Sequence, residues 1–310
     1  MSSVATPAQV PRRRRRRGTK LQRRQTRLAW LLLLPALAVV VFVAIYPLAK
    51  TVSQSFTNQE FLAGLTPTKS VGLDNYRTLI HDTIFRDTVV LTIKFTVITV
   101  AFEFVLGLII ALVVNSSFKG RGAMRAVMLV PWAIPTVVAA KMWQWMLDDT
   151  YGVVNDMGVR THVLSHPHAW LAEPSTQLAA VAAVDIWKTT PFVALLLLAG
   201  LQVIPNDLYE AASVDGASKL QQFWRITLPL LRPAILVVLI FRTLDALRVF
   251  DVFQVFFGYR LGAQSMAVYN QSTIVGDGHV GYGAAMSVAI FLIIALFVVI
   301  YVTVVRVSEE

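Results

Sequence analysis

The stretch PNDLYEAASVDGASKLQQFWRITLPLLRP (residues 205–233) decides how the rest of this chain is interpreted. It is a polar segment between two long apolar runs, and its residue pattern predicts two short helices joined by a turn. The pair Asp215-Gly216 is expected to end the first helix, because glycine suits the left-handed conformation that often follows a helix. We therefore expect a helix, a tight turn and a second helix between two apolar segments.

Polar residues at fixed positions mark where the two helices start. Asn206 is expected to cap the first helix, and Asp207 places a negative charge at its positive end. Ser218 is expected to cap the second helix, with Gln221 completing an S-x-x-Q capping box. Pro229 is expected to end the second helix, because a proline disfavours helical geometry in the residue before it. One face of this helix is expected to hold Leu220, Phe223, Trp224 and Thr227.

The residue spacing within this stretch resembles the EAA motif of ABC importer permeases. The motif's fixed positions are matched by Glu210-Ala211-Ala212, three residues, Gly216, nine residues, Ile226, one residue and Leu228-Pro229. In that family the loop is cytoplasmic and forms a coupling helix that docks in a groove of the ATPase subunit. The resemblance implies that the ATPase-coupling residues are Glu210, Ala211, Ala212, Asp215 and Gly216. The alternative is an amphipathic loop on the membrane surface, but such a loop has no need of this spacing.

The composition excludes an ordinary soluble globular protein. Hydrophobic residues make up 56% of the chain, charged residues only 15%, and the mean hydropathy is +0.62. There is no cysteine, so the chain has no disulfide and no cysteine-based metal site. The net charge of +10 comes from residues 1–27, which hold ten Lys or Arg and no acid, whereas the other 18 basic residues balance 18 acidic ones. We predict a disordered basic tail against anionic headgroups, and no nucleic-acid partner.

Six apolar segments are long enough to cross a hydrocarbon core of ~30 Å, which takes about 20 helical residues. The predicted spans are residues 28–48, 88–114, 123–147, 177–204, 234–257 and 284–305. The first span follows an Arg-rich segment, so a cleaved signal peptide is the alternative. Its apolar run is longer than the roughly 7–15 residues of a signal h-region, and no A-x-A site closes it, so we expect a retained span.

The basic residues predict an orientation with both chain ends in the cytoplasm. Segments 1–27, 115–125, 205–233 and the C-terminal end hold 17 Lys or Arg, whereas segments 49–87, 148–176 and 258–283 hold 6. The richer set is expected inside. This count places the Glu210 loop in the cytoplasm independently of the motif.

Two segments expected outside the cell carry further patterns. VGLDNY at residues 71–76 is similar to the F-G-L-x-N-Y stretch of sugar-importer permeases, and Gly152 and Asn155 resemble the Gly-x-x-Asn that follows the third span there. We expect His162, His166 and His168 to be solvated loop side chains, because they lack the carboxylate or scaffold of a metal site. No internal repeat or second domain is evident, so residues 28–310 are predicted to form one permease domain.

The sequence has no signature of a catalytic site. No G-x-x-x-x-G-K-[ST] occurs, so the chain lacks a P-loop and is not itself an ATPase. No G-x-S-x-G or H-E-x-x-H occurs either. We therefore expect a non-enzymatic subunit that binds no cofactor and no metal. The resemblance implies that ATP and Mg²⁺ are used by the partner ATPase.

Ionisable side chains inside the spans are costly in lipid and are functional candidates by default. Glu103 lies near the middle of the second predicted span. The fifth span holds a series with a spacing of three residues: Arg242, Asp245, Arg248 and Asp251. Neighbours at this spacing share one helix surface and can form alternating ion pairs. Two interpretations stay open: a network that holds helices together, and a polar wall of the translocation path that offers hydrogen bonds to sugar hydroxyls.

The segment WKTTPF (residues 187–192) is expected to open the fourth span. Pro191 is expected to break the backbone ladder and expose carbonyl groups toward a cavity. Trp187 stacks on a pyranose face in one interpretation and is an interfacial belt residue in the other. We place Trp187 and Lys188 with the charged residues of the spans as candidates for the translocation pathway.

The wider resemblance runs from about residue 28 to the C-terminus. WKTTPF, the EAA loop and FRTLDALRVFD (residues 241–251) look most like the trehalose-importer permeases of actinobacteria. The resemblance implies an all-α, polytopic fold with six transmembrane helices in the plasma membrane. Implied partners are a second permease subunit, two ATPase subunits and an extracytoplasmic substrate-binding protein. Many relatives have T-x-G-G-P after the fifth span, whereas this chain has Phe257-Gly258-Tyr259-Arg260.

Charge pairing bears on the substrate. A neutral sugar needs hydrogen bonds and a stacking face, whereas an anionic phosphate ester favours unpaired Arg or Lys. Each Arg of the fifth span has an Asp three residues away, and Glu103 adds negative charge. We therefore predict a neutral disaccharide, such as trehalose or a maltose-like glucoside, over glycerol-3-phosphate.

Two other classes are weighed against an importer permease. An ATP-independent secondary transporter or channel often shows paired broken helices in two halves, and the sequence shows no such pairing. A membrane-anchored scaffold has no need of charges in the middle of its spans.

Overall fold

The computed structural model describes residues 20–60, 68–116 and 119–307. Within these ranges the chain is helical apart from turns and one isolated β-bridge between Thr57 and Ser70. The chain divides into two compact units, Met1–Lys50 and Thr51–Glu310. The predicted tail lies mostly outside the described residues, but its last part, from Lys20 onward, is helical.

The described part of the first unit, residues 20–50, is helical throughout. The helix α1 (Lys20–Val40) continues through the π-helical turn η1 (Val41–Ile45) into α2 (Tyr46–Gln54). Pro47 is the second residue after the π turn, and the wider turn relieves the clash of a proline ring with the carbonyl four residues earlier. Residues Arg24–Gln54 are long and apolar enough to cross a membrane, which confirms the first predicted span.

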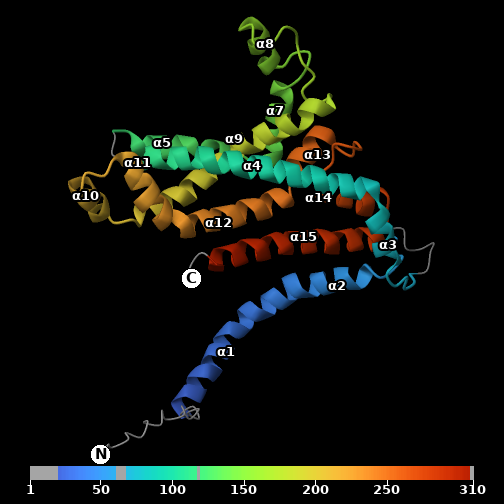
Figure 1. Ribbon diagram of the computed structural model, residues 1–310. Helices are drawn as coiled ribbons and strands as arrows, with labels where there is room; N and C mark the ends of the chain where they lie inside the picture. Colours follow the sequence, from blue (N-terminus) through green and yellow to red (C-terminus); the bar gives the residue numbers. More distant parts are fainter. Residues whose placement is uncertain (1–19, 61–67, 117–118, 308–310) are drawn as a thin grey trace, which may run out of the picture. The chain divides into compact units, whose positions relative to one another are not determined.

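Four long helices of the second unit lie side by side, α4, α9, α12 and α15 (Figure 1). The elements of this unit after α2 are α3 (Asp74–His81), α4 (Thr83–Asn115), α5 (Arg121–Met128), α6 (Val130–Ala133), α7 (Thr136–Met146), α8 (Val153–Arg160), α9 (Pro174–Gln202), α10 (Asn206–Val214), α11 (Lys219–Gln222), η2 (Phe223–Thr227), α12 (Leu228–Leu247), α13 (Asp251–Phe257), α14 (Met266–Gln271), η3 (Ser272–Gly276) and α15 (Val280–Val307). The helices α10 and α11 lie at the same end of this bundle as the C-terminal end of α15, and α3 lies at the opposite end.

Glycines allow the central helices to approach closely. A Cβ at Gly107 of α4 would lie 2.5 Å from a methyl group of Val193 on α9. A Cβ at Gly200 of α9 would lie 2.5 Å from that of Ala234 on α12. Both distances are well inside van der Waals contact, so only glycine allows these helix pairs to pack as they do. Close backbone contacts at these glycines therefore hold α4 and α12 against α9, which is the most buried of the candidate spans.

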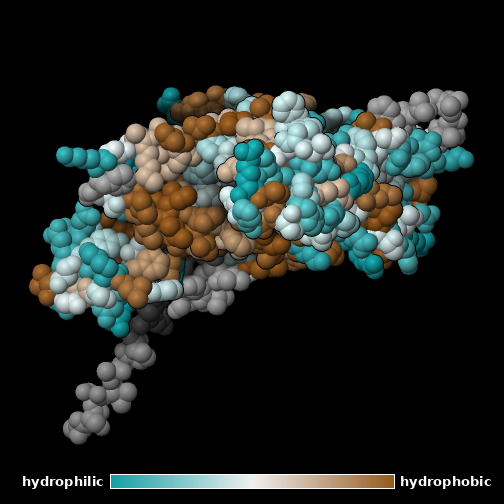
Figure 2. Space-filling model, turned by 90° about the horizontal axis from the view of Figure 1, so that it is seen from above, coloured by the Kyte–Doolittle hydropathy of each residue, from teal (hydrophilic) through white to brown (hydrophobic). Residues whose placement is uncertain are grey.

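The exposed faces of these helices are apolar. Large exposed side chains include Val97, Phe102 and Ile109 on α4 and Leu292 and Leu296 on α15. Figure 2 shows teal, polar side chains at the end that holds α10 and at the opposite end, with brown, apolar areas between these ends and a further teal and white group near the centre of the view. This pattern is that of helices that cross a bilayer and carry polar ends into water.

The third predicted span is not one straight helix. Its two parts, Arg121–Ala133 and Thr136–Met146, meet at an angle of 87°. Between them Ile134 is extended (φ −70°, ψ 131°), because it precedes Pro135 and a proline disfavours the helical conformation in the residue before it. The structure therefore has five helices that could cross a membrane, or six if this bent pair is one span, within the described residues.

The fourth and fifth predicted spans are confirmed within Pro174–Gln202 and Lys219–Phe257, but a detail of each differs from the prediction. The helix α9 begins at Pro174 and runs unbroken through Pro191, so WKTTPF lies in mid-helix and Pro191 does not interrupt it. The fifth span is interrupted, because α12 ends at Leu247 and α13 starts at Asp251. The second and sixth spans are confirmed, with helices at Thr83–Asn115 and Val280–Tyr301.

The patterns at residues 71–76 and 152–155 each join separate pieces of chain. Asn75 of VGLDNY donates to the carbonyls of Ser55 and Thr57 (2.8 and 2.9 Å). The buried Asn155 donates to the carbonyls of Asp148 and His168, and its Oδ1 accepts from the indole N–H of Trp170 (2.9 Å). In these loops, asparagine side chains therefore donate hydrogen bonds to backbone carbonyls that have no partner in a helix or strand.

Candidate functional site

Three of the central helices are joined by a buried ion network centred on Arg242 of α12. Its Nε donates to Glu103 Oε2 of α4 (2.6 Å), and its Nη2 donates to Glu103 Oε1 (2.9 Å) and to Asp185 Oδ2 of α9 (3.0 Å). Its Nη1 donates to Asp245 Oδ2 (2.7 Å). The side chains of Arg242 and Glu103 are 3% and 0% exposed. The network thus uses four of the five N–H groups of the guanidinium.

This geometry explains how charges are held inside the spans. A buried charge is tolerated only when it is paired and its remaining hydrogen-bonding groups are satisfied. Here Glu103 takes a two-pronged contact from Arg242, and the hydroxyl of Thr189 lies 2.5 Å from Glu103 Oε1. The interpretation of the span charges as a network between helices is therefore correct for Glu103 and Arg242, whereas Asp245 pairs with Arg242 within α12.

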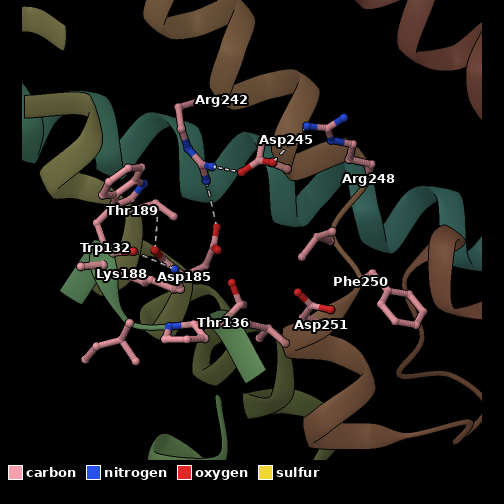
Figure 3. A pocket seen from close by; sticks show the side chains of 16 residues that line it. Trp132, Thr136, Asp185, Lys188, Thr189, Arg242, Asp245, Arg248, Phe250 and Asp251 are labelled. Atoms are coloured by element: carbon pink, nitrogen blue, oxygen red, sulfur yellow. Dashed lines mark hydrogen bonds and ion pairs between the residues drawn. The ribbon is translucent and has the colours of Figure 1, made fainter. Parts of the chain in front are cut away.

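A cavity of about 500 Å³ lies beside this network (Figure 3). It is bordered by the two helix breaks, one between α6 and α7 and the other between α12 and α13. Its labelled lining residues are Trp132, Thr136, Asp185, Lys188, Thr189, Arg242, Asp245, Arg248, Phe250 and Asp251. Backbone away from regular helix is tolerated at membrane depth where it lines such a cavity.

The lining supplies equal numbers of cations and carboxylates: Lys188, Arg242 and Arg248, against Asp185, Asp245 and Asp251. Lys188 Nζ donates to the carbonyl oxygen of Trp132 (3.4 Å), which is the second-to-last residue of α6. Arg248 lies 3.6 Å from Asp245 and is 70% exposed. No lining cation of the cavity is thus both buried and without an acceptor.

The spacing argument for the fifth span holds for three of its four residues. Arg242 and Arg248 both contact Asp245, as the interval of three predicts. Asp251 is different, because the helix stops at Leu247 and Asp251 begins the next helix, α13. It still lines the cavity, but it does not continue the surface of α12, so that part of the prediction was wrong.

The structure separates Trp187 from the other candidates. Its ring packs edge-on against Trp143 of α7 with centroids 5.4 Å apart, and Trp187 does not line the cavity. Two aromatic side chains line the cavity, Phe250 and Trp132. Trp132 is 46% exposed and stacks on Phe192 at 5.6 Å and an interplanar angle of 10°. The sequence reading missed Trp132 and Asp185. Asp185 had a detectable signal, a carboxylate inside an apolar run three residues before Lys188.

The loop at residues 205–233 has the two helices and the turn that were predicted. Gly216 has φ +79°, the left-handed conformation. The capping box is confirmed, with Gln221 N–H donating to Ser218 Oγ (3.3 Å) and Ser218 N–H donating to Gln221 Oε1 (2.8 Å). Asp207 lies in the first turn of α10.

Three details of this loop were predicted wrongly. Asn206 is the first helical residue and makes no capping hydrogen bond, because the extended Pro205 takes the N-cap position. Pro229 does not end the second helix, which passes through the π turn η2 into α12; the wider turn accommodates the proline ring. The π turn also rotates the side chains, so Thr227 is buried while Leu220 and Trp224 are exposed.

The proposed coupling residues lie together on this loop. Glu210, Ala211, Asp215 and Gly216 are exposed and Ala212 is half-buried. Ala212, Asp215 and Gly216 line a cavity of about 400 Å³ with Gln221, Gln222 and Arg225. Exposed apolar side chains surround them, among them Val214 (88%). A surface that combines exposed polar and apolar side chains in this way suits contact with another protein.

A second carboxylate joins distant elements at the other end of the bundle. Asp82 caps α4 and accepts hydrogen bonds from the hydroxyls of Tyr282 (2.6 Å) and Tyr269 (2.9 Å). Partial burial acts to raise the pKa of Asp82, but the hydrogen bonds from Tyr282, from the N–H of Phe85 and from Tyr269 together lower it. The burial of Tyr269 and its bond to Asp82 raise the pKa of the Tyr269 hydroxyl. Asp82 is therefore ionised, and its hydrogen bonds join the start of α4 to α14 and α15.

The three histidines at residues 162, 166 and 168 form no common site. His168 Nε2 lies 3.3 Å from Glu173, and His166 Nδ1 lies 2.9 Å from Ser165 Oγ. In the part of the chain that the structure describes, no group of three or more His, Cys, Asp or Glu could hold a metal ion.

Helices that can cross a bilayer, helix breaks around a charged cavity and a loop suited to another protein together define a membrane transport component. Residues 103–309 match the family of binding-protein-dependent transport system inner membrane components. The chain belongs to this family. It is a multi-pass inner membrane protein.

Named relatives cover nearly the whole chain. The trehalose/maltose transport system permease protein MalF of Thermococcus litoralis is 40% identical, over 94% of this chain and 98% of that protein. The sulfoquinovosyl glycerol transport system permease protein SmoG of Agrobacterium fabrum is 39% identical, over 91% of each. The trehalose transport system permease protein SugA of Mycobacterium tuberculosis is 37% identical, over 93% of this chain and 91% of that protein.

A solved structure confirms the fold. A bacterial ABC transporter involved in the import of the acidic polysaccharide alginate contains a chain that matches with a TM-score of 0.80. The match covers 94% of this chain and 100% of that one, at 24% identity. The prediction of an all-α permease fold is thus confirmed.

Proposed function

We propose that this chain is one permease half of an ATP-driven importer that moves a neutral sugar, with trehalose or a maltose-like glucoside as the favoured class. The observation that carries the proposal is the cavity between the helix breaks. Its cations are equal in number to its carboxylates, and the guanidinium of Arg242 donates most of its N–H groups to protein acceptors. The exposed ring of Trp132 also lines the cavity. The relatives named for trehalose and maltose transport support the same class.

The chemistry of the lining favours hydroxyl donors. Arg242 has one N–H group left for a ligand, whereas Asp251 has no protein donor among the described contacts. Carboxylates accept hydrogen bonds from sugar hydroxyls, and an indole face packs against the C–H face of a pyranose. Trp132 takes the stacking role that the sequence suggested for Trp187. Glu103, Arg242, Asp245 and Arg248 then hold and border the translocation pathway.

The rest of the importer follows from family membership. The partners we propose are a second permease subunit, two ATPase subunits that use ATP and Mg²⁺, and an extracytoplasmic binding protein. The chain itself is non-catalytic, with both ends and the Glu210 loop in the cytoplasm. ATP binding closes the ATPases, displaces this loop and reorients the cavity.

A charged sugar derivative is the second candidate, since one relative is named for sulfoquinovosyl glycerol transport. The only cation at the cavity that is mostly exposed is Arg248, which is already close to Asp245. A strong anion site favours a desolvated, unopposed guanidinium. The balanced lining therefore disfavours this candidate.

The complete complex in proteoliposomes tests the choice of substrate. Binding protein loaded with a neutral disaccharide is expected to stimulate ATP hydrolysis and sugar uptake, because the cavity offers acceptors and no surplus cation. The measurement compares stimulation by neutral, sulfonated and phosphorylated sugars at equal occupancy of the binding protein. Stimulation by the charged ligands alone contradicts the proposal.

A further inference from the structure

Two buried side chains connect the halves of the 205–233 loop. In the segment from Lys219 to Thr227, the buried residues are Gln222 (4% exposed) and Thr227 (5%). Gln222 Nε2 lies 2.9 Å from Ser213 Oγ of α10 and 3.2 Å from the carbonyl of Ala217. The hydroxyl of Tyr209 on α10 lies 3.0 Å from Thr227 Oγ1. These contacts form two rungs between α10 and the α11–η2 segment.

The π turn makes two rungs possible. Tyr209 and Ser213 are four residues apart and share one face of α10, where Ser213 Oγ also donates to the Tyr209 carbonyl (2.7 Å). Gln222 and Thr227 are five residues apart, which in an α-helix places side chains about 140° from each other. In η2 the backbone bond runs from Leu228 N–H to the Phe223 carbonyl, five residues back, so side chains at this interval share a face.

The joined loop continues without a break into the fifth span. The π turn η2 ends at Thr227 and α12 starts at Leu228. Fourteen residues further along α12, about 21 Å at 1.5 Å per residue, lies Arg242 at the cavity. A displacement of α10 that the rungs pass to η2 therefore reaches the ion network as a movement of α12.

We propose that Tyr209 and Gln222 are positioning residues that make α10 and α12 move as one body, so that movement of the Glu210 loop reaches the cavity. This inference rests on the proposed function of an ATP-driven importer. Without the rungs, α10 remains attached to α12 through the turn at Gly216, the short α11 and the apolar packing of the ring at position 209. ATP hydrolysis then continues, but the helices that line the cavity move less, so less sugar is moved per ATP.

The double variant Tyr209→Phe/Gln222→Met tests this role, because it removes the hydroxyl and the amide while keeping side-chain size. In proteoliposomes that hold the complete complex, we expect sugar moved per ATP hydrolysed to fall about tenfold. Val237→Ala, on the exposed side of α12, is the matched control and is expected to keep the wild-type ratio. A wild-type ratio in the double variant overturns the inference and leaves the proposed function standing. Failure of the wild-type complex to move any sugar overturns the proposed function instead.

A second readout does not depend on the cargo. Spin labels on Val214→Cys and Leu230→Cys, both exposed positions in a cysteine-free chain, report the distance between α10 and α12. The inference predicts one narrow distance that is the same without nucleotide and with ATP, and a broad distribution once Tyr209→Phe/Gln222→Met is added. A distance that changes with ATP in the otherwise unaltered chain overturns it, and so does a narrow distance in the double variant. If the double variant does not assemble, Tyr209→Phe alone replaces it, and loss of assembly there too shows that the contacts only fold the loop.

Discussion

Arg242→Met is expected to destabilise the permease by about 3–5 kcal/mol, the cost typical of removing one partner from a buried ion pair. Glu103 is fully buried and receives two hydrogen bonds from Arg242, and Asp185 receives a third. Methionine fills a similar volume but leaves these carboxylates without a cation. In detergent, the temperature of half-unfolding should fall by roughly 10 °C, measured by size-exclusion fluorescence after heating.

The chain provides its own control for this substitution. Arg248→Met removes a cation six residues away that is 70% exposed and 3.6 Å from its partner, so the expected cost is under about 1 kcal/mol. Adding Glu103→Gln to Arg242→Met removes one of the orphaned charges and should recover part of the loss. Equal unfolding temperatures for Arg242→Met and Arg248→Met would show that the network does not hold the helices together.

Gly216→Pro and Glu210→Lys are each expected to abolish sugar uptake while the permease still inserts. Gly216 has φ +79°, whereas a proline ring fixes φ near −65° and removes the N–H that donates to the Ser213 carbonyl (3.1 Å). The turn that joins α10 to α11 therefore cannot form. Glu210 is exposed on α10, and reversal of its charge repels the basic ATPase groove that the family resemblance implies. Uptake of labelled sugar by cells, divided by the amount of permease in the membrane fraction, measures the effect.

The control for the turn lies at the other end of the bundle. Gly278 also has φ +79°, between η3 and α15. Gly278→Pro introduces the same backbone conflict away from the loop, so it can lower the amount of permease but should leave uptake per molecule measurable. Normal uptake by both Gly216→Pro and Glu210→Lys would refute the assignment of this loop to ATPase coupling.

Local signals in the sequence predicted local structure well. Apolar runs located the spans, and the Ser218/Gln221 spacing and Gly216 gave the turn and the cap, because each depends on residues within one helical turn of each other. The Arg242–Asp245 pair was predictable for the same reason. The errors arose at prolines. The bend beside Pro135 was not predicted, and the helix was expected to end at Pro229, whereas the π turn before it lets the helix continue.

Long-range contacts at the candidate site could not be predicted from one sequence. Glu103 and Arg242 are 139 residues apart, and only the packing of α4, α9 and α12 brings them together. The position of Asp185 beside Lys188 could have marked it as a candidate, but not its pairing with Arg242, which comes from another helix. The choice between Trp187 and Trp132 depended on the bend in the third span, which turns the segment of Trp132 toward the cavity.

The central claim, that the 205–233 loop receives the ATPase, is tested most directly by site-specific cross-linking in cells. A photoreactive amino acid replaces Val214, 88% exposed on the loop, or Val163, 79% exposed on the segment predicted to lie outside. Irradiation is expected to link the ATPase subunit to the permease labelled at Val214 and to leave it unlinked at Val163. An ATPase adduct at Val163 and none at Val214 would contradict both the coupling assignment and the orientation of the chain.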